Sequence, residues 1–68
     1  MNEDAFNLSV RKFLKQFGVK AQRAIEQAVR GAEEAGTLGG QQRLKARVTL
    51  ELEGVPLRET VDGVIELV

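Results

Sequence analysis

The chain alternates between polar and apolar residues over one segment, Arg43-Leu44-Lys45-Ala46-Arg47-Val48-Thr49-Leu50-Glu51-Leu52-Glu53. A period of two residues is typical of a β-strand with one buried face and one solvated face. After Gly54-Val55-Pro56 the odd positions continue the alternation, with Glu59 and Gly63 as exceptions, through Leu57, Val61, Ile65 and Leu67. The pattern predicts an antiparallel β-hairpin with strands at about residues 43–53 and 57–67.

Charge selects one register for this hairpin. If Leu52 lies opposite Leu57, three oppositely charged pairs form on the polar face: Arg43 with Glu66, Arg47 with Asp62, and Glu51 with Arg58. Each cross-strand pair contributes roughly 0.2–1 kcal/mol, and a slip by one residue would turn one strand's apolar set outward. Because Pro56 cannot donate a backbone hydrogen bond, we expect a loop wider than a two-residue turn.

Composition limits the size and chemistry of the protein. Its 68 residues predict one domain, residues 1–68, with ten basic and ten acidic side chains. Cys, His, Trp and Tyr are absent and only three Phe are present, so the core must be small and aliphatic and no disulfide or thiolate metal site can form. We expect no metal and no cofactor. Domains of this size often need a second subunit, so self-association is one of our expectations.

The ends and hydropathy of the chain bear on location. The start, Met1-Asn2-Glu3-Asp4, is acidic, unlike the basic beginning of a signal peptide. No apolar run is long enough to span a membrane. We therefore expect a cytosolic protein without membrane association.

Two helices are predicted before the hairpin. The first, at about residues 3–17, has Asn2 as its N-cap and ends at Gly18, with an apolar face made of Phe6, Val10, Phe13, Leu14 and Phe17. The second, at about residues 21–35, ends at Gly36 and has an alanine-rich apolar face. The predicted fold is α+β with the order ααββ: two N-terminal helices packed on one face of the C-terminal antiparallel hairpin.

Charge is unevenly distributed along the chain. Residues 11–30 carry six basic side chains and one acidic, whereas residues 51–68 carry five acidic and one basic. Solvated helix and strand faces explain this pattern without a partner. A candidate interaction surface lies on the side of the first helix away from the phenylalanines, made of Leu8, Arg11, Lys12 and Lys15. An apolar side chain among cations could contact an acidic partner, although a single exposed Leu is also ordinary.

The sequence offers no catalytic constellation. Without His and Cys, the commonest general base and the strongest nucleophile are missing, so we expect no enzymatic activity. Glu59 is unusual because it falls on the apolar face, opposite Leu50. Either the strand bulges or bends near the turn and leaves Glu59 at the rim, or Glu59 is a buried acid with a raised pKa.

Nucleic-acid binding is the alternative function. Two helices joined by Gly18-Val19-Lys20 and followed by a hairpin are similar to a helix-turn-helix with a wing, and the contacts would come from Gln22, Arg23, Gln27 and Arg30. Leu14 and Gln27 depart from the residue types that this motif requires, and the zero net charge weakens the reading further. We therefore favour a protein partner, or a second copy of this chain, over nucleic acid.

Most of the chain resembles a family of short bacterial proteins, about 65–70 residues long, without an assigned function. The resemblance rests on residues 1–15, 18–19, 22–30 and 61–67, while Lys20 and Ala21 stand where the family has a capping Thr or Ser. It implies a small soluble α+β protein and transfers no catalytic residues. Together with the composition, it leads us to expect a non-enzymatic cytosolic interaction module that could self-associate.

Overall fold

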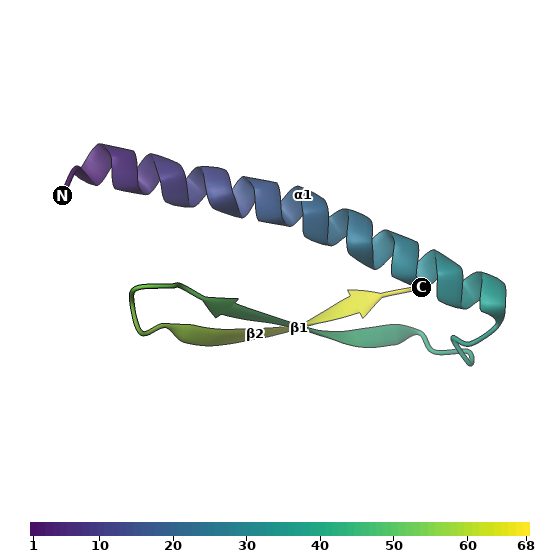
Figure 1. Cartoon of the computed structure of the whole chain (residues 1–68). Helices are drawn as coiled ribbons and strands as arrows, with labels where there is room; N and C mark the ends of the chain where they lie inside the picture. Colours follow the sequence, from purple (N-terminus) through teal and green to yellow (C-terminus); the bar gives the residue numbers. More distant parts are fainter. The chain divides into compact units, whose positions relative to one another are not determined.

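A computed structural model describes all residues, 1–68, in one helix and two strands. Helix α1 spans Glu3–Ala35, strand β1 spans Arg43–Glu51 and strand β2 spans Arg58–Glu66 (Figure 1). The chain divides into two compact units, Met1–Leu38 with the helix and Gly39–Val68 with the hairpin. Each unit is described by itself.

The two predicted helices are one. Helix α1 runs without interruption through Gly18, Val19 and Lys20, so the element order is αββ and the predicted ααββ fold is wrong. Gly18 has no positive φ angle, whereas a glycine that ends a helix in the left-handed conformation does. A glycine inside a helix costs only about 1 kcal/mol relative to alanine, which the rest of a 33-residue helix can outweigh.

Both ends of α1 are capped as the sequence predicts. The side chain of Asn2 accepts a hydrogen bond from the amide of Ala5 at 3.0 Å, and acidic residues follow in the first turn. At the other end Gly36 has a φ of 72°, and its amide donates to the carbonyl of Glu33. The amide of Thr37 donates to the carbonyl of Ala32 at 2.9 Å. These two bonds form a Schellman motif, which ends the helix.

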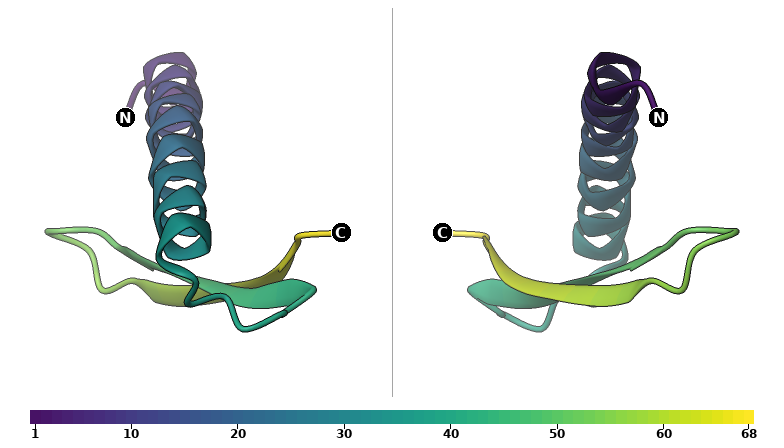
Figure 2. Two further views of the ribbon diagram at one scale, coloured as in Figure 1. Left: turned by 90° about the vertical axis from the view of Figure 1, so that its right-hand side faces the viewer. Right: turned by 90° about the vertical axis from the view of Figure 1, so that its left-hand side faces the viewer.

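The hairpin has the register that its charges predict. Arg43 lies opposite Glu66, Val48 opposite Val61 and Glu51 opposite Arg58, without a bulge. The strands twist strongly about each other (Figure 2), as isolated two-stranded ribbons do. Each strand is shorter than predicted at the turn, where residues 52–57 form the wide loop expected from Pro56 and Gly54 has a φ of 89°.

All three predicted ion pairs form on the polar face of the hairpin. Arg47 donates to Asp62 at 2.7 Å, and the other two nitrogen–oxygen distances are 3.7 Å for Arg43–Glu66 and 3.5 Å for Arg58–Glu51. All six side chains are more than half exposed, so each pair contributes at most about 1 kcal/mol. Their main effect is therefore to fix the register of the strands.

A charge swap tests this register. Asp62→Arg should lower the free energy of unfolding by about 1 kcal/mol, because it places two cations directly opposite each other. Adding Arg47→Asp should recover most of that loss, since the opposite charges then face each other with their positions exchanged. Urea unfolding of both variants measures the effect. A double variant no more stable than the single one would contradict the observed pairing.

Candidate interaction surface

The principal candidate is a stripe of apolar side chains along α1. Its members follow one another at spacings of three and four residues, with two adjacent pairs, from the first turn of the helix to the last. The apolar stripe consists of Phe6, Val10, Phe13, Leu14, Phe17, Ala21, Ala24, Ile25, Ala28, Ala32 and Ala35. At 1.5 Å per residue it is about 44 Å long.

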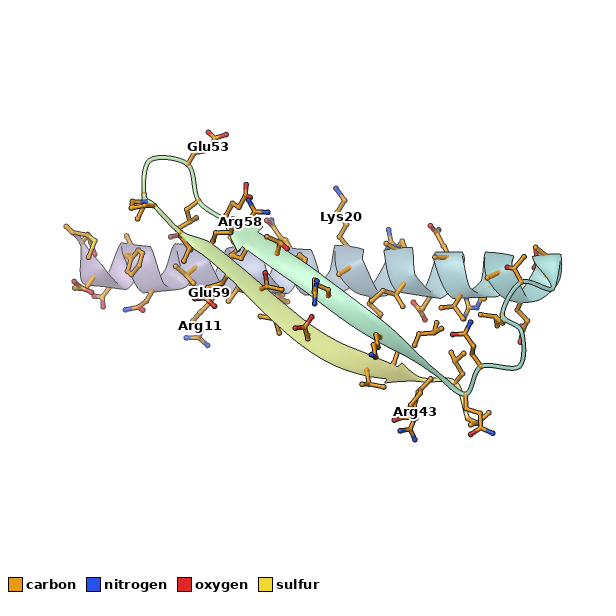
Figure 3. The ribbon with its side chains drawn as sticks, turned by 90° about the horizontal axis from the view of Figure 1, so that it is seen from below. Arg11, Lys20, Arg43, Glu53, Arg58 and Glu59 are labelled. Carbon is orange, nitrogen blue, oxygen red and sulfur yellow. The ribbon has the colours of Figure 1, made fainter.

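The stripe keeps the same phase on both sides of Gly18. Phe17 and Ala21 are four residues apart, and Leu14 and Ala21 are seven apart, which places all three on one helix face. The two faces predicted for separate helices therefore join into one. Arg11 and Lys20 project from opposite sides of α1 and mark the two flanks of the stripe (Figure 3).

Neither unit contains a buried residue. The three stripe phenylalanines are 41–53% exposed, and Leu14 is 50% exposed. On the hairpin, the apolar face is half-buried at Leu44, Ala46, Leu50 and Ile65, while Val61 is exposed. Burying one phenylalanine side chain contributes about 1.5–3 kcal/mol. The stripe is therefore the largest source of association energy that the helix offers.

The predicted cluster of Leu8, Arg11, Lys12 and Lys15 lines one shallow hollow on α1. Leu8 is 68% exposed and lies outside the apolar stripe. None of the three cations forms a salt bridge within the chain. The cluster is thus a second, smaller candidate surface, made of one apolar side chain and three free cations.

The residues predicted to contact nucleic acid are not arranged as that alternative requires. Gln22, Arg23, Gln27 and Arg30 lie on the middle and C-terminal parts of a continuous helix, and no turn precedes them. Arg30 is engaged with Glu26 at 3.9 Å. The helix-turn-helix geometry, on which the nucleic-acid hypothesis depended, is absent because Gly18-Val19-Lys20 is helical.

Glu59 lies opposite Leu50 on the apolar face of the hairpin, as the register predicts. The strand does not bulge there, but Glu59 is the second residue of β2 and is exposed at the turn end of the strand, which agrees with the expected position at the rim. The alternative of a buried acid is wrong. Glu53, also exposed, lies in the loop at the tip of the hairpin (Figure 3).

Two kinds of feature are absent from the chain. No group of three or more Asp or Glu side chains is arranged to hold a metal ion. No helix combines the length and the apolar character that crossing a bilayer demands.

The stripe could have been found from the sequence by following the phase of its apolar positions across Gly18. A turn that separates two helices has no reason to preserve this phase, whereas a continuous helix must preserve it. The absence of a good N-cap at Lys20 is a second signal. Both point to one helix.

These elements define a small α+β protein with a long amphipathic helix and an antiparallel hairpin. The chain belongs to DUF6494, a family of unknown function that matches residues 1–68. The match confirms the resemblance to a family of short proteins without an assigned function. No curated protein and no solved structure matches the chain.

Proposed function

We propose that the protein is a non-enzymatic, cytosolic protein–protein interaction module whose docking surface is the apolar stripe of α1. The observation that carries this proposal is the unbroken stripe of about 44 Å with three half-exposed phenylalanines. Such a face is typical of a helix that binds another protein surface. The lack of cysteine is consistent with a reducing compartment.

The energetics of the helix support a partner. Most of the stability of a helix in a protein comes from packing its amphipathic face, because helix propensity alone is marginal. Gly18 and Gly31 each cost a further 0.8–1 kcal/mol or so relative to alanine. A 33-residue helix with this composition therefore depends on covering its stripe.

The carboxylates of the hairpin have structural partners. Glu51, Asp62 and Glu66 each pair with an arginine on the solvated face. A solvated carboxylate beside arginine is poorly suited to acid–base catalysis. This arrangement supports the non-enzymatic part of the proposal.

Fluorine NMR of chains labelled with fluorophenylalanine tests the proposal. We expect three ring signals that report solvent contact in the dilute monomer, because an unoccupied stripe is exposed. A bound partner, whether another protein or a second copy of this chain, should shield the three rings from solvent. Rings fully shielded in a dilute monomer would contradict the proposal, since the chain would then cover its own stripe.

A further inference from the structure

We propose that the occupant of the apolar stripe is the stripe of a second copy of this chain, running antiparallel. This inference rests on the proposed function and names the partner. Two independent features of α1 carry it: the distribution of side-chain size along the stripe and the distribution of charge along the helix.

Side-chain size divides the stripe into two unequal halves. The half before Gly18 is bulky, with all three phenylalanines, Val10 and Leu14. The half after Gly18 is thinner, because five of its members are alanines, Ala21, Ala24, Ala28, Ala32 and Ala35, and the larger side chains are Ile25 and, beside the stripe, Val29. A bulky half and a thin half of equal length can complement each other when the helices run in opposite directions.

A two-fold axis between Lys20 and Ala21 brings four bulky residues of one copy opposite small residues of the other. Phe6 then lies opposite Ala35 of the second copy, Phe13 opposite Ala28, Phe17 opposite Ala24, and Val10 opposite Gly31. Each of these four layers pairs one large side chain with one small one, which is how facing helix surfaces interdigitate. Leu14 and Ile25 lie opposite Gln27 and Gln16, whose long side chains fill the remaining layers. The interface is isologous and closes as a dimer.

The antiparallel arrangement also gives Gly31 a role. No atom lies within 4 Å of a Cβ built at this position, so nothing within the chain explains why it carries a glycine. In the pair it lies beside the thin half of the stripe and faces Val10 of the second copy. A parallel pair would instead bring Phe13 against Phe13 and Ala28 against Ala28. The two helix axes would then have to be far apart at one end of the pair and close together at the other.

Charge favours the same orientation. Residues 3–20 carry four basic and two acidic side chains, and residues 21–35 carry two basic and three acidic. Antiparallel pairing places the basic half of each helix beside the acidic half of the other, whereas parallel pairing places like beside like.

The last turn of α1 supports this reading. It contains Glu33 and Glu34 and no basic residue, which is unfavourable because the C-terminus of a helix carries partial negative charge. The basic half of an antiparallel neighbour compensates both carboxylates. One contact opposes the pairing: Lys20 lies near the two-fold axis beside Lys20 of the second copy, so Lys20→Gln should tighten the dimer.

Exchanging a large and a small side chain between the two halves of the stripe tests the antiparallel pairing of the helices. Sedimentation equilibrium of the full chain should show a monomer–dimer equilibrium. Phe13→Ala and Ala28→Phe should each raise the dissociation constant at least about 10-fold, because one leaves a void and the other opposes two phenylalanines. The double variant should return within about 3-fold of the unmodified chain, because both layers again pair large with small.

Disulfide cross-linking between introduced cysteines tests the relative direction of the two helices independently, since the chain has no cysteine of its own. An equimolar mixture of Val10→Cys and Gly31→Cys chains should form the mixed disulfide under mild oxidation. Val10→Cys alone should not cross-link, because its two thiols would be about 30 Å apart in the antiparallel pair. This measurement does not depend on whether Ala28→Phe folds.

The outcomes separate this inference from the proposed function. A chain that is monomeric at every concentration overturns the second copy as occupant, and exposed fluorinated rings in that monomer would leave the interaction module standing. A dimer in which Val10→Cys cross-links to itself overturns the antiparallel orientation. A dimer unaffected by all three size variants overturns the stripe as its interface.

Discussion

A chain carrying Phe17→Asp should remain monomeric at concentrations at which the unmodified chain associates. Phe17 is the last bulky residue before the middle of the stripe and is 41% exposed without a partner. Burying its ring contributes about 1.5–3 kcal/mol, and an unpaired carboxylate in its place adds a desolvation cost. Because a dimer contains the change twice, association should weaken by about 3 kcal/mol or more. Sedimentation velocity over a dilution series measures the shift.

Leu8→Asp is the matched control for this experiment. It likewise replaces an exposed apolar side chain of the same helix by a carboxylate, with a somewhat larger loss of helix propensity, but outside the apolar stripe. The new carboxylate lies one turn from Arg11 and Lys12, which should offset part of the cost. We expect nearly unchanged association. The reverse result, with Leu8→Asp disruptive and Phe17→Asp harmless, would move the docking surface to the cluster of Leu8, Arg11, Lys12 and Lys15.

The hairpin could be predicted in detail because its information is local and redundant. Alternation defined the apolar face, and the three charge pairs then allowed only one register, which the structure reproduces with Arg47 and Asp62 at 2.7 Å. The wide loop followed from the missing amide hydrogen of Pro56. The limits of the strands were overextended by one or two residues at the turn, and by one residue at Leu67, because alternation continues after the pairing has ended.

The helix was misinterpreted because glycine alone does not identify a helix end. Gly36 and Gly18 look alike in the sequence, but only Gly36 has the left-handed conformation and the Schellman hydrogen bonds. What distinguishes them is the chain that follows. After Gly36 the helical spacing of apolar residues, every three or four positions, ends in Thr37-Leu38-Gly39-Gly40. After Gly18 the same spacing continues on the same helix face. Periodicity over a long window was the stronger evidence.

The continuity of the helix also changes which surface is the larger candidate. Two short helices that covered the hairpin with their phenylalanines would leave Leu8 as the conspicuous exposed side chain. The continuous helix makes the stripe longer than either strand, which no local pattern reveals. The length of the stripe depends on the continuity of the helix through Gly18, so it could not be read from the residues around Leu8.

Ala21→Pro should lower the free energy of unfolding by about 3 kcal/mol or more. In a continuous helix, proline at this position removes the hydrogen bond to the carbonyl of Phe17, and its ring clashes with that carbonyl. If a second helix instead began here, residue 21 would be its first helical position, where proline is well tolerated. Circular dichroism during urea unfolding, at a fixed protein concentration, measures the difference.

Gly18→Ala should change the free energy of unfolding in the opposite direction from Ala21→Pro. A Cβ at this position meets no atom within 4 Å, and the backbone there is helical, so alanine should stabilise the chain by up to about 1 kcal/mol. A glycine that ended a helix with a positive φ would make the same substitution destabilising. Loss of stability with Ala21→Pro and gain with Gly18→Ala can both occur only if α1 is one helix. That continuity is also what brings the bulky and the thin halves of the stripe onto a single face, where each can complement the other in a second copy.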